Sequence, residues 1–509
     1  MAPDLCLLPK SAAVPAARLT AAGTTMLTSA IVYFAGRVGA ALIVLLAISI
    51  YTRLLSPAEY GIYALVVSGV TMTYAATMQW LALSLGRFLP AYPEREDIVL
   101  SHVAASYLVV ALVVVLGAAL AAGFLEPDAD GFGLFVLGVI FFLAVSFSEL
   151  SLVVFQARRQ PLFYIGFALV RVGLASAIGI VLAFLGWGSV GLLVGLVIGN
   201  LCISLPNALL NWRVVRFRLL ERRLLTELAA YGLPFAMTGA LGAFITLSDR
   251  YILEFLIGAE ATGLYAASYD LAMRSLHVLM MVVAMACNPV IFRVYETEGR
   301  AAAEPLIRGQ GELLLGLALP AAIGFIMLAP AITVVMLGEE FQQAARELIP
   351  WIAVATVLSG FQAFYLSLAF SLPKQPLQQT CVFAAGALVN VILNFLLILR
   401  LGLIGAALAT VAAYALIVAG SFLVGRRLYP LPFSKTALWK VLTGCAALVL
   451  ILWPVRDSTE VPLVILHGLT GAIAYAMIVC SLDLAQSRRP CGRMLRRGLA
   501  YMRGCLVRS

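Results

Sequence analysis

Long apolar runs constrain this chain more than any other feature. Stretches such as Val109–Leu116 and Ala446–Leu452 contain no polar side chain, and a helix of about 20 apolar residues crosses the hydrocarbon layer of a bilayer. Only 12% of the residues are charged and the mean hydropathy is +1.02, whereas soluble domains carry about 25% charged residues. These values exclude a soluble fold and a disordered chain. An outer-membrane barrel does not fit either, because its strands alternate apolar and polar residues. The sequence predicts an all-α polytopic membrane protein.

Segments of this length, read between polar or Gly/Pro breaks, predict about 14 transmembrane helices. The expected spans are 29–50, 60–85, 98–122, 132–155, 162–185, 189–210, 230–252, 263–291, 311–336, 348–370, 379–399, 403–424, 437–453 and 462–482. With the N-terminus in the cytoplasm, 26 of the 34 Lys and Arg residues fall on the cytoplasmic side, 4 on the outer side and 4 inside spans. This asymmetry follows the positive-inside rule. It predicts an even number of spans and two cytoplasmic termini.

Three short sequence matches recur in the same order, six helices apart. RQPL at 159–162 matches KQPL at 374–377, GIYA at 61–64 matches GLYA at 263–266, and Gly186 with Gly191 matches Gly402 with Gly405. Because the matches are six helices apart, an even number, both halves cross the membrane in the same orientation. This implies a pseudo-two-fold axis along the membrane normal. We therefore expect two parallel six-helix lobes plus a C-terminal helix pair, with helices 1 and 7 lining the lobe interface. The expected division is a cytoplasmic tail 1–28, an N-lobe 29–211, a basic cytoplasmic linker 212–228, a C-lobe 229–425, helices 13 and 14 in 426–485 and a basic cytoplasmic tail 486–509.

Two motifs carry a resemblance to a known family. The segment RLLSPAEYGIY at 53–63 resembles the first-loop signature of the polysaccharide biosynthesis (O-antigen and exopolysaccharide) flippases, and DRYIL at 249–253 followed by GLY at 263–265 resembles their seventh-to-eighth helix region. This family belongs to the multidrug/oligosaccharidyl-lipid/polysaccharide exporter superfamily. The resemblance implies a two-lobed flippase of the bacterial inner membrane with a cationic cavity. The implied cargo is an undecaprenyl-diphosphate-linked oligosaccharide, and the implied partners are membrane lipids and other polysaccharide-assembly proteins rather than nucleic acid.

Arginines inside the expected spans are candidate substrate ligands, because a charge buried in lipid costs at least ~2.5 kcal/mol. Arg37, Arg171 and Arg274 lie in helices 1, 5 and 8, the last two near the midplane. Arg37 could instead snorkel to the inner interface, and Arg274 could pair with Asp270, four residues earlier on the same helix. Arg250, at the outer end of helix 7, could anchor that end at the interface, but the family resemblance also implies a cavity role.

Carboxylates in or near the spans are the expected counter-charges or coupling groups. Glu149 lies in helix 4, Asp249 near the outer end of helix 7 and Asp270 in helix 8. Arg53 and Glu59, in the first outer loop, fit a structural turn or a salt bridge of a gate better than substrate contact. Four asparagines in helices 6 and 11 fit interhelical hydrogen bonds, or contacts with sugar hydroxyls: Asn200, Asn207, Asn390 and Asn394.

Two other functions remain open. A cation-coupled multidrug antiporter of the same superfamily would need acidic residues lining its cavity, and the candidate carboxylates are few. A polytopic polysaccharide-assembly enzyme typically carries a large outer loop with acidic or histidine residues, but the longest outer loop expected here, 337–347, has eleven residues. The sequence contains no Gly-x4-Gly-Lys-Ser/Thr motif and no Cys-x-x-Cys spacing, and its three histidines are scattered. We expect no ATP site, metal, cofactor or disulfide framework.

Overall fold

The computed structural model describes residues 16–125 and 129–484, and this part of the chain is built from helices without strands. The long apolar runs form helices because, in lipid, a backbone must satisfy its own hydrogen bonds. The first half contains α1 (Ala16–Leu54), α2 (Pro57–Thr77), α3 (Gln79–Phe88), α4 (Glu96–Leu125), α5 (Ala129–Ala157), α6 (Pro161–Leu182) and α7 (Gly188–Leu210). The second half contains α8 (Arg222–Leu256), α9 (Ala259–Glu298), α10 (Arg300–Met327), α11 (Ala329–Met336), α12 (Glu339–Phe361), α13 (Leu368–Ser371), α14 (Pro376–Leu401) and α15 (Leu403–Leu428). The last two helices are α16 (Lys435–Leu452) and α17 (Val461–Ser481).

The number of spans agrees with the prediction. Twelve helical runs in the described residues are long and apolar enough to cross a membrane, and α2 with α3, bent by 49°, forms a thirteenth. One of the twelve, Pro161–Leu210, has 50 residues, which as a straight helix would be ~75 Å long. It turns back at Gly186 and Gly188, both at positive φ, and its two parts, α6 and α7, pack against each other. When the bent pair α2–α3 is added and Pro161–Leu210 is counted as two spans, the described residues contain 14 spans.

Two boundaries differ from the sequence reading. Helix α1 begins at Ala16, 13 residues before the expected span, because the Ala-rich stretch ahead of the apolar run also favours helix. Helix α8 begins at Arg222, so the inter-lobe linker is 211–221 and the last expected linker residues form its first turns. The expected tail 486–509 lies outside the described residues, as does the first part of the tail 1–28.

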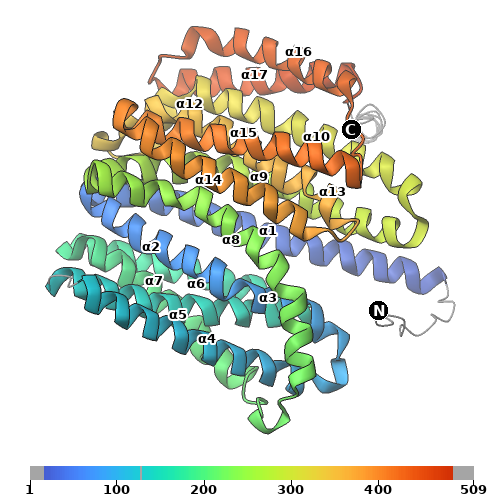
Figure 1. The fold of residues 1–509 in the computed structure, drawn as a ribbon. Coiled ribbons are helices and arrows are strands. Elements are labelled where there is room, and N and C mark those ends of the chain that lie inside the picture. The colour runs from blue at the N-terminus through green and yellow to red at the C-terminus, as the bar shows by residue number, and fades with distance from the viewer. Residues whose placement is uncertain (1–15, 126–128, 485–509) are drawn as a thin grey trace, which may run out of the picture.

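The helices form two groups, which we call the N-lobe (α1–α7) and the C-lobe (α8–α15). Figure 1 shows the N-lobe in blue to teal on one side of the molecule and the C-lobe in green to orange on the other. Helices α16 and α17 pack on each other and, through α10, on the far side of the C-lobe. Across the lobe interface, α1 packs on α9, α2 on α8 and α9, and α3 on α8. Helices 1 and 7 (α1 and α8) thus both line the lobe interface, as expected, and each packs on a helix of the other lobe.

The backbone repeats between the halves where the sequence matches predicted it. Arg159 and Lys374 both adopt positive φ, 56° and 57°, and the amide of the following glutamine bonds the carbonyl five residues back in each case, Gln160 to Phe155 and Gln375 to Phe370. Gly402 has φ 57° and ψ −134°, like Gly188 at φ 50° and ψ −134°. The sequence comparison had aligned Gly402 with Gly186, so the glycine match shifts by two residues.

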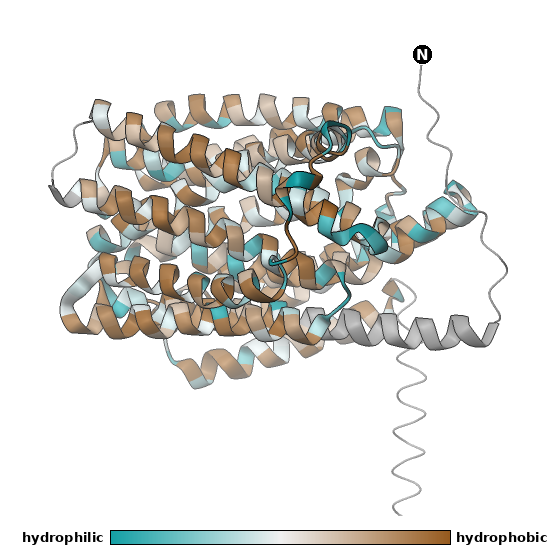
Figure 2. Ribbon diagram, turned by 90° about the horizontal axis from the view of Figure 1, so that it is seen from below, coloured by the Kyte–Doolittle hydropathy of each residue, from teal (hydrophilic) through white to brown (hydrophobic). Residues whose placement is uncertain are grey.

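Apolar side chains cover the outside of the bundle as well as its interior. Figure 2 shows brown, hydrophobic residues along the long helices and the more hydrophilic stretches in connecting segments. On α4, Val109 and Leu120 are 63% and 65% exposed. A soluble protein rarely exposes contiguous apolar surface of this kind, so these faces contact lipid.

Candidate functional site

Helices α2 and α9 cross at two glycines that sit at equivalent positions of the repeat. A Cβ built on Gly61 would lie 2.1 Å from the carbonyl oxygen of Ala259, and one on Gly263 would lie 1.8 Å from that of Pro57. The contact is reciprocal, as expected if the pseudo-two-fold axis passes between the two glycines. Only glycine permits this backbone approach. We call this contact the glycine crossing; it joins the two lobes at the end of the bundle expected to face outward.

Further contacts at the same end join α1 to the C-lobe. The amide of Gly338 donates to the Thr52 hydroxyl at 3.0 Å, and the Arg53 guanidinium donates to the carbonyl oxygen of Val335 at 2.7 Å. Glu59 forms a capping box with Ser56 at the start of α2. Arg53 and Glu59 therefore do not form the gate salt bridge considered above. Arg53 instead bridges the lobes, and Glu59 stabilises the helix start.

Arg250 also bridges the lobes. Its side chain is 3% exposed, and its guanidinium donates to Asp270 on α9 at 2.8 Å and to Ser68 on α2 at 3.0 Å. Tyr251, the next residue, donates to the backbone carbonyl of Leu65 on α2 at 2.8 Å. Because Asp270 bonds Arg250, the intrahelical pair of Asp270 with Arg274 is absent. Nothing in the sequence distinguished Ser68 from other small polar residues of the spans.

Asp249 points the other way, into the C-lobe. It is fully buried and accepts hydrogen bonds from Tyr265 at 2.8 Å, from Asn394 at 2.9 Å and from Thr410. These donors come from α9, α14 and α15. Asn390, one turn before Asn394, accepts from Ser248 at 3.3 Å. Asn390 and Asn394 thus form interhelical hydrogen bonds, and Asp249 is a carboxylate held by neutral donors at the junction of four helices.

The N-lobe contains a second charged cluster. Arg171 on α6 pairs with Glu149 on α5 at 2.6 Å and donates to Ser148 at 3.1 Å. Ser148 in turn donates to Asn200 on α7 at 2.6 Å. Glu149 is therefore the counter-charge of Arg171, so this cluster has no net charge. Asn207 bonds the Ile203 carbonyl on its own helix and accepts from Asn211.

Arg37 and Arg274 are the two candidate arginines that form no ion pair among the described residues. Both side chains are exposed. Arg37, on α1, approaches the sulfur of Met281 on α9 at 3.8 Å. Arg274 lies seven residues before Met281, hence on the same face of α9 and ~10 Å further along it, and it interacts electrostatically with Tyr63 on α2. Each arginine therefore faces the opposite lobe.

Other acidic and metal-binding groups add little to this site. In the described part of the chain, no three His, Cys, Asp or Glu residues are placed to hold a metal ion. The sequence reading missed Glu254, in the last turn of α8, one of whose carboxylate oxygens is buried without a hydrogen bond. His277 packs its ring on Phe364 at 4.8 Å. None of these groups pairs with Arg37 or Arg274 in the described residues.

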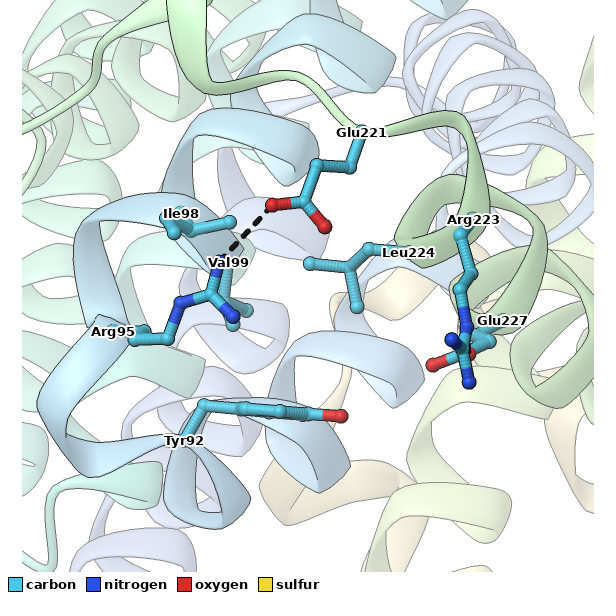
Figure 3. Close-up of a pocket in the computed structure, with 8 residues that line it drawn as sticks. All are labelled: Tyr92, Arg95, Ile98, Val99, Glu221, Arg223, Leu224 and Glu227. Atoms are coloured by element: carbon cyan, nitrogen blue, oxygen red, sulfur yellow. Dashed lines mark hydrogen bonds and ion pairs between the residues drawn. The ribbon is translucent and has the colours of Figure 1, made fainter.

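The linker between the lobes is fixed to the N-lobe at the opposite end of the bundle. His102 on α4 is buried, and its Nε2 lies 2.7 Å from the amide of Glu221. Arg95 pairs with the Glu221 carboxylate at 3.0 Å (Figure 3), beside a pocket of about 180 Å³. The other charged residues of that pocket, Arg223 and Glu227, pair with each other. Because these charges neutralise one another, the pocket is a junction rather than a ligand site.

Comparison with known proteins identifies the family. A family model described as polysaccharide biosynthesis protein matches residues 50–346, which is more than half of the chain. The chain belongs to the polysaccharide biosynthesis protein family. The resemblance read from the two motifs is thereby confirmed. A search of curated proteins found no match.

Solved structures share the fold of this family member. The lipid II flippase MurJ, in an inward closed conformation, matches with a TM-score of 0.71 and 14% identity, over 90% of this chain and 99% of that one. An inward-facing multidrug resistance MATE transporter matches with 0.57 and 17%, over 78% and 97%. A superfamily transporter from Pyrococcus furiosus, described as having a binding pocket of reverse polarity, matches with 0.60 and 18%, over 79% and 95%. The protein is a multi-pass membrane protein with a transporter-like fold.

Proposed function

We propose that this protein flips an undecaprenyl-diphosphate-linked oligosaccharide across the bacterial inner membrane for cell-surface polysaccharide synthesis. The single observation that carries the proposal is the position of Arg37 and Arg274, two cations that face each other's lobe and have no carboxylate partner in the described part of the chain. An arginine fork donates paired, charge-assisted hydrogen bonds to a phosphate. Membership of the polysaccharide biosynthesis family and the fold shared with a lipid II flippase support this cargo class.

Ion pairs distinguish two of the four candidate arginines from the two that we assign to the cargo. Arg171 is neutralised by Glu149 and Arg250 by Asp270, so these two organise the lobes, while Arg37 and Arg274 hold the diphosphate. A multidrug antiporter would present carboxylates to a cationic drug, but Glu149 and Asp270 are paired with arginines. This arrangement favours an anionic cargo. The large outer domain typical of a polysaccharide-assembly enzyme is also missing from the described chain, since α11 and α12 are separated by two residues.

The transport cycle is alternating access between the lobes. The glycine crossing and the Arg53 contact hold the outer end together, and the α3–α8 contact lies at the other end, where Ser84 donates to the Leu228 carbonyl at 2.7 Å. When the contacts at one end break while those at the other end hold, Arg37 and Arg274 are exposed to one side of the membrane at a time. Both termini would lie in the cytoplasm, as the distribution of basic residues predicts.

We assign ion coupling to Asp249. The Arg250 guanidinium bonds Asp270 instead, so the hydrogen bonds that Asp249 accepts come from neutral donors on three other helices of the C-lobe. Protonation or cation binding would change those bonds and could reposition α9, α14 and α15 against α8. An Asp249→Asn variant keeps the shape but loses the charge. We expect it to fold and to lose the dependence of transport on an imposed ion gradient, measured in proteoliposomes.

The test of the main proposal compares Arg274→Ala, Arg274→Lys and, as a matched control, Arg427→Ala. Arg427 is exposed at the end of α15, away from the lobe interface. A charge-assisted hydrogen bond contributes about 1.5–3 kcal/mol, so Arg274→Ala should lower export ~10- to 150-fold with normal protein abundance. Arg274→Lys should recover part of the export, because the positive charge remains but the guanidinium fork is lost. The readout is surface glycan together with lipid-linked glycan accumulating in the inner leaflet. Normal export by alanine variants of both Arg37 and Arg274 would rule out the cationic site.

A further inference from the structure

An apolar groove of about 330 Å³ lies on the outer flank of the N-lobe, between α4, α5 and the start of the linker. Its lining residues are Ala104, Tyr107, Leu108, Phe147, Leu150, Trp212, Val215 and Phe217. The volume falls in the range of ligand pockets, about 300–1,000 Å³. Leu108 and Phe217, on opposite sides of the groove, are 53% and 54% exposed. The groove is therefore open to the surroundings of the bundle rather than enclosed.

The floor of the groove is a fixed aromatic cluster. The ring of Phe147 lies 5.6 Å from that of Tyr107 and 5.4 Å from that of Trp212. The Tyr107 hydroxyl donates to the Leu143 carbonyl on α5 at 3.0 Å. The indole N–H of Trp212 is buried and has no acceptor among the described residues. The floor of the groove is thus apolar and held in place by ring contacts and one hydrogen bond.

The depth of the groove corresponds to the inner leaflet. Tyr107 lies eleven residues after the start of α4 at Glu96, or ~16 Å along the helix. Phe147 lies ten residues before the end of α5 at Ala157, or ~15 Å. With this end of the bundle on the cytoplasmic side, the groove runs from the membrane surface into the acyl-chain region.

Three arginines flank the surface end of the groove. Arg213, Arg216 and Arg218 alternate with its wall residues along the linker, are exposed and form no ion pair among the described residues. The backbone amide of Arg216 donates to the Ser101 hydroxyl of α4 at 2.7 Å, which holds this part of the linker against the groove. A compact triple positive charge at a membrane surface attracts anionic lipid headgroups.

We infer that the groove and these arginines together form a binding site for an anionic glycerophospholipid of the inner leaflet. One acyl chain occupies the groove, and the phosphate lies on Arg213, Arg216 and Arg218. The occupant is a bulk lipid rather than the cargo, because α4 and α5 pack mainly on α2, α3, α6 and α7. Arg37 and Arg274 lie instead on α1 and α9, which pack on each other across the lobe interface. The bound lipid would fasten the linker that joins the lobes to the membrane surface.

The test measures lipid binding to the purified full-length protein by native mass spectrometry, with phosphatidylglycerol and phosphatidylcholine of identical chains. One variant removes the charges, Arg213→Gln/Arg216→Gln/Arg218→Gln. A second, Ala104→Trp, fills the groove, and Phe217→Ser removes an exposed part of its wall if the tryptophan impairs folding. The matched control removes three other exposed arginines of the cytoplasmic end, Arg293→Gln/Arg426→Gln/Arg427→Gln.

We expect the wild type and the control to prefer phosphatidylglycerol. The charge variant should bind it on the order of 100-fold more weakly, since each basic residue contributes about 1 kcal/mol. Its loss of affinity for phosphatidylcholine should be smaller, because the choline group offsets the phosphate charge. The groove variants should weaken both lipids. Wild-type affinity in the charge variant, equal loss in the control, or no preference for phosphatidylglycerol would overturn the inference. Displacement of phosphatidylglycerol by undecaprenyl diphosphate, blocked by Ala104→Trp, would overturn it in favour of the cargo tail. Because binding is measured directly, these outcomes are independent of whether the protein transports a glycan.

Discussion

Adding a single methyl group at the glycine crossing should bias the protein away from the conformation described above. In Gly61→Ala the new Cβ would lie 2.1 Å from a backbone carbonyl oxygen, and in Gly263→Ala 1.8 Å from another, whereas ordinary contacts begin at 3.4 Å. Differences of 1.3 and 1.6 Å must be absorbed by moving α2 and α9 apart, because backbone atoms cannot rotate out of the way. Such overpacking costs about 1–3 kcal/mol. That corresponds to a ~5- to 150-fold shift in the equilibrium between closed and open outer ends.

The assay uses a reporter cysteine at Ala64, one turn after Gly61 and 1% exposed. In a version of the protein without its eight native cysteines, Ala64→Cys should react with a membrane-impermeant maleimide from the outer side only when the crossing opens. Both glycine variants should raise the labelling rate, Gly263→Ala at least as much as Gly61→Ala. The matched control is Gly117→Ala on α4, where an added Cβ meets no atom within 4 Å. Unchanged labelling in both variants, or equal labelling in the control, would show that this crossing does not close the outer end.

Three further predictions follow from the charge pairs and the topology. Arg250→Gln leaves the partly buried Asp270 carboxylate, 18% exposed, without its partner and should lower the free energy of unfolding in detergent by about 3 kcal/mol. The double variant Arg250→Gln/Asp270→Asn should be more stable than the single one, and a double variant as unstable as the single would refute the pair. Arg171→Ala should cost less than Arg250→Gln, because the Arg171 and Glu149 side chains are 18% and 35% exposed, against 3% and 18% for Arg250 and Asp270, and loss of stability equal to that of Arg250→Gln would contradict this ranking. A reporter fused after Ser509 should be active only in the cytoplasm, and periplasmic activity would exclude the proposed topology.

Helix positions were predictable because span length is set by the bilayer and apolar runs of that length have few alternative structures. The pairing of Glu149 with Arg171 was predictable as well, since few other charges occur inside the spans of that lobe. The partner of Asp270 was not. Spacing on one helix favoured Arg274, but the structure selects Arg250 on α8. Which of two arginines reaches a carboxylate depends on how α8 packs on α9, and the sequence carries no direct signal of that packing.

Asp249 and Arg250 show a second limit of sequence reasoning. Neighbouring residues on a helix point ~100° apart, so an adjacent acid and base looked like one local feature of a helix end. In the structure they serve different surfaces, Asp249 inside the C-lobe and Arg250 against the N-lobe. The glycines 61 and 263 were recognised as a repeat, but their role as a close helix crossing became apparent only from the backbone distances.

The distribution of charge over the repeated backbone bears on the direction of transport. The two halves repeat the same turns at Arg159 and Lys374, and α1 with α9 and α2 with α8 are equivalent contacts under the pseudo-two-fold axis. A symmetric backbone alone gives no reason for the lobes to respond differently to an ion. The charged clusters are not symmetric, because the N-lobe holds the Glu149–Arg171 ion pair and the C-lobe holds the buried Asp249 carboxylate, whose hydrogen-bond donors are neutral. Any energy that an ion gradient supplies should therefore enter through the C-lobe, so that removing the Asp249 charge changes the direction or driving force of transport, while removing the Glu149–Arg171 pair changes only stability.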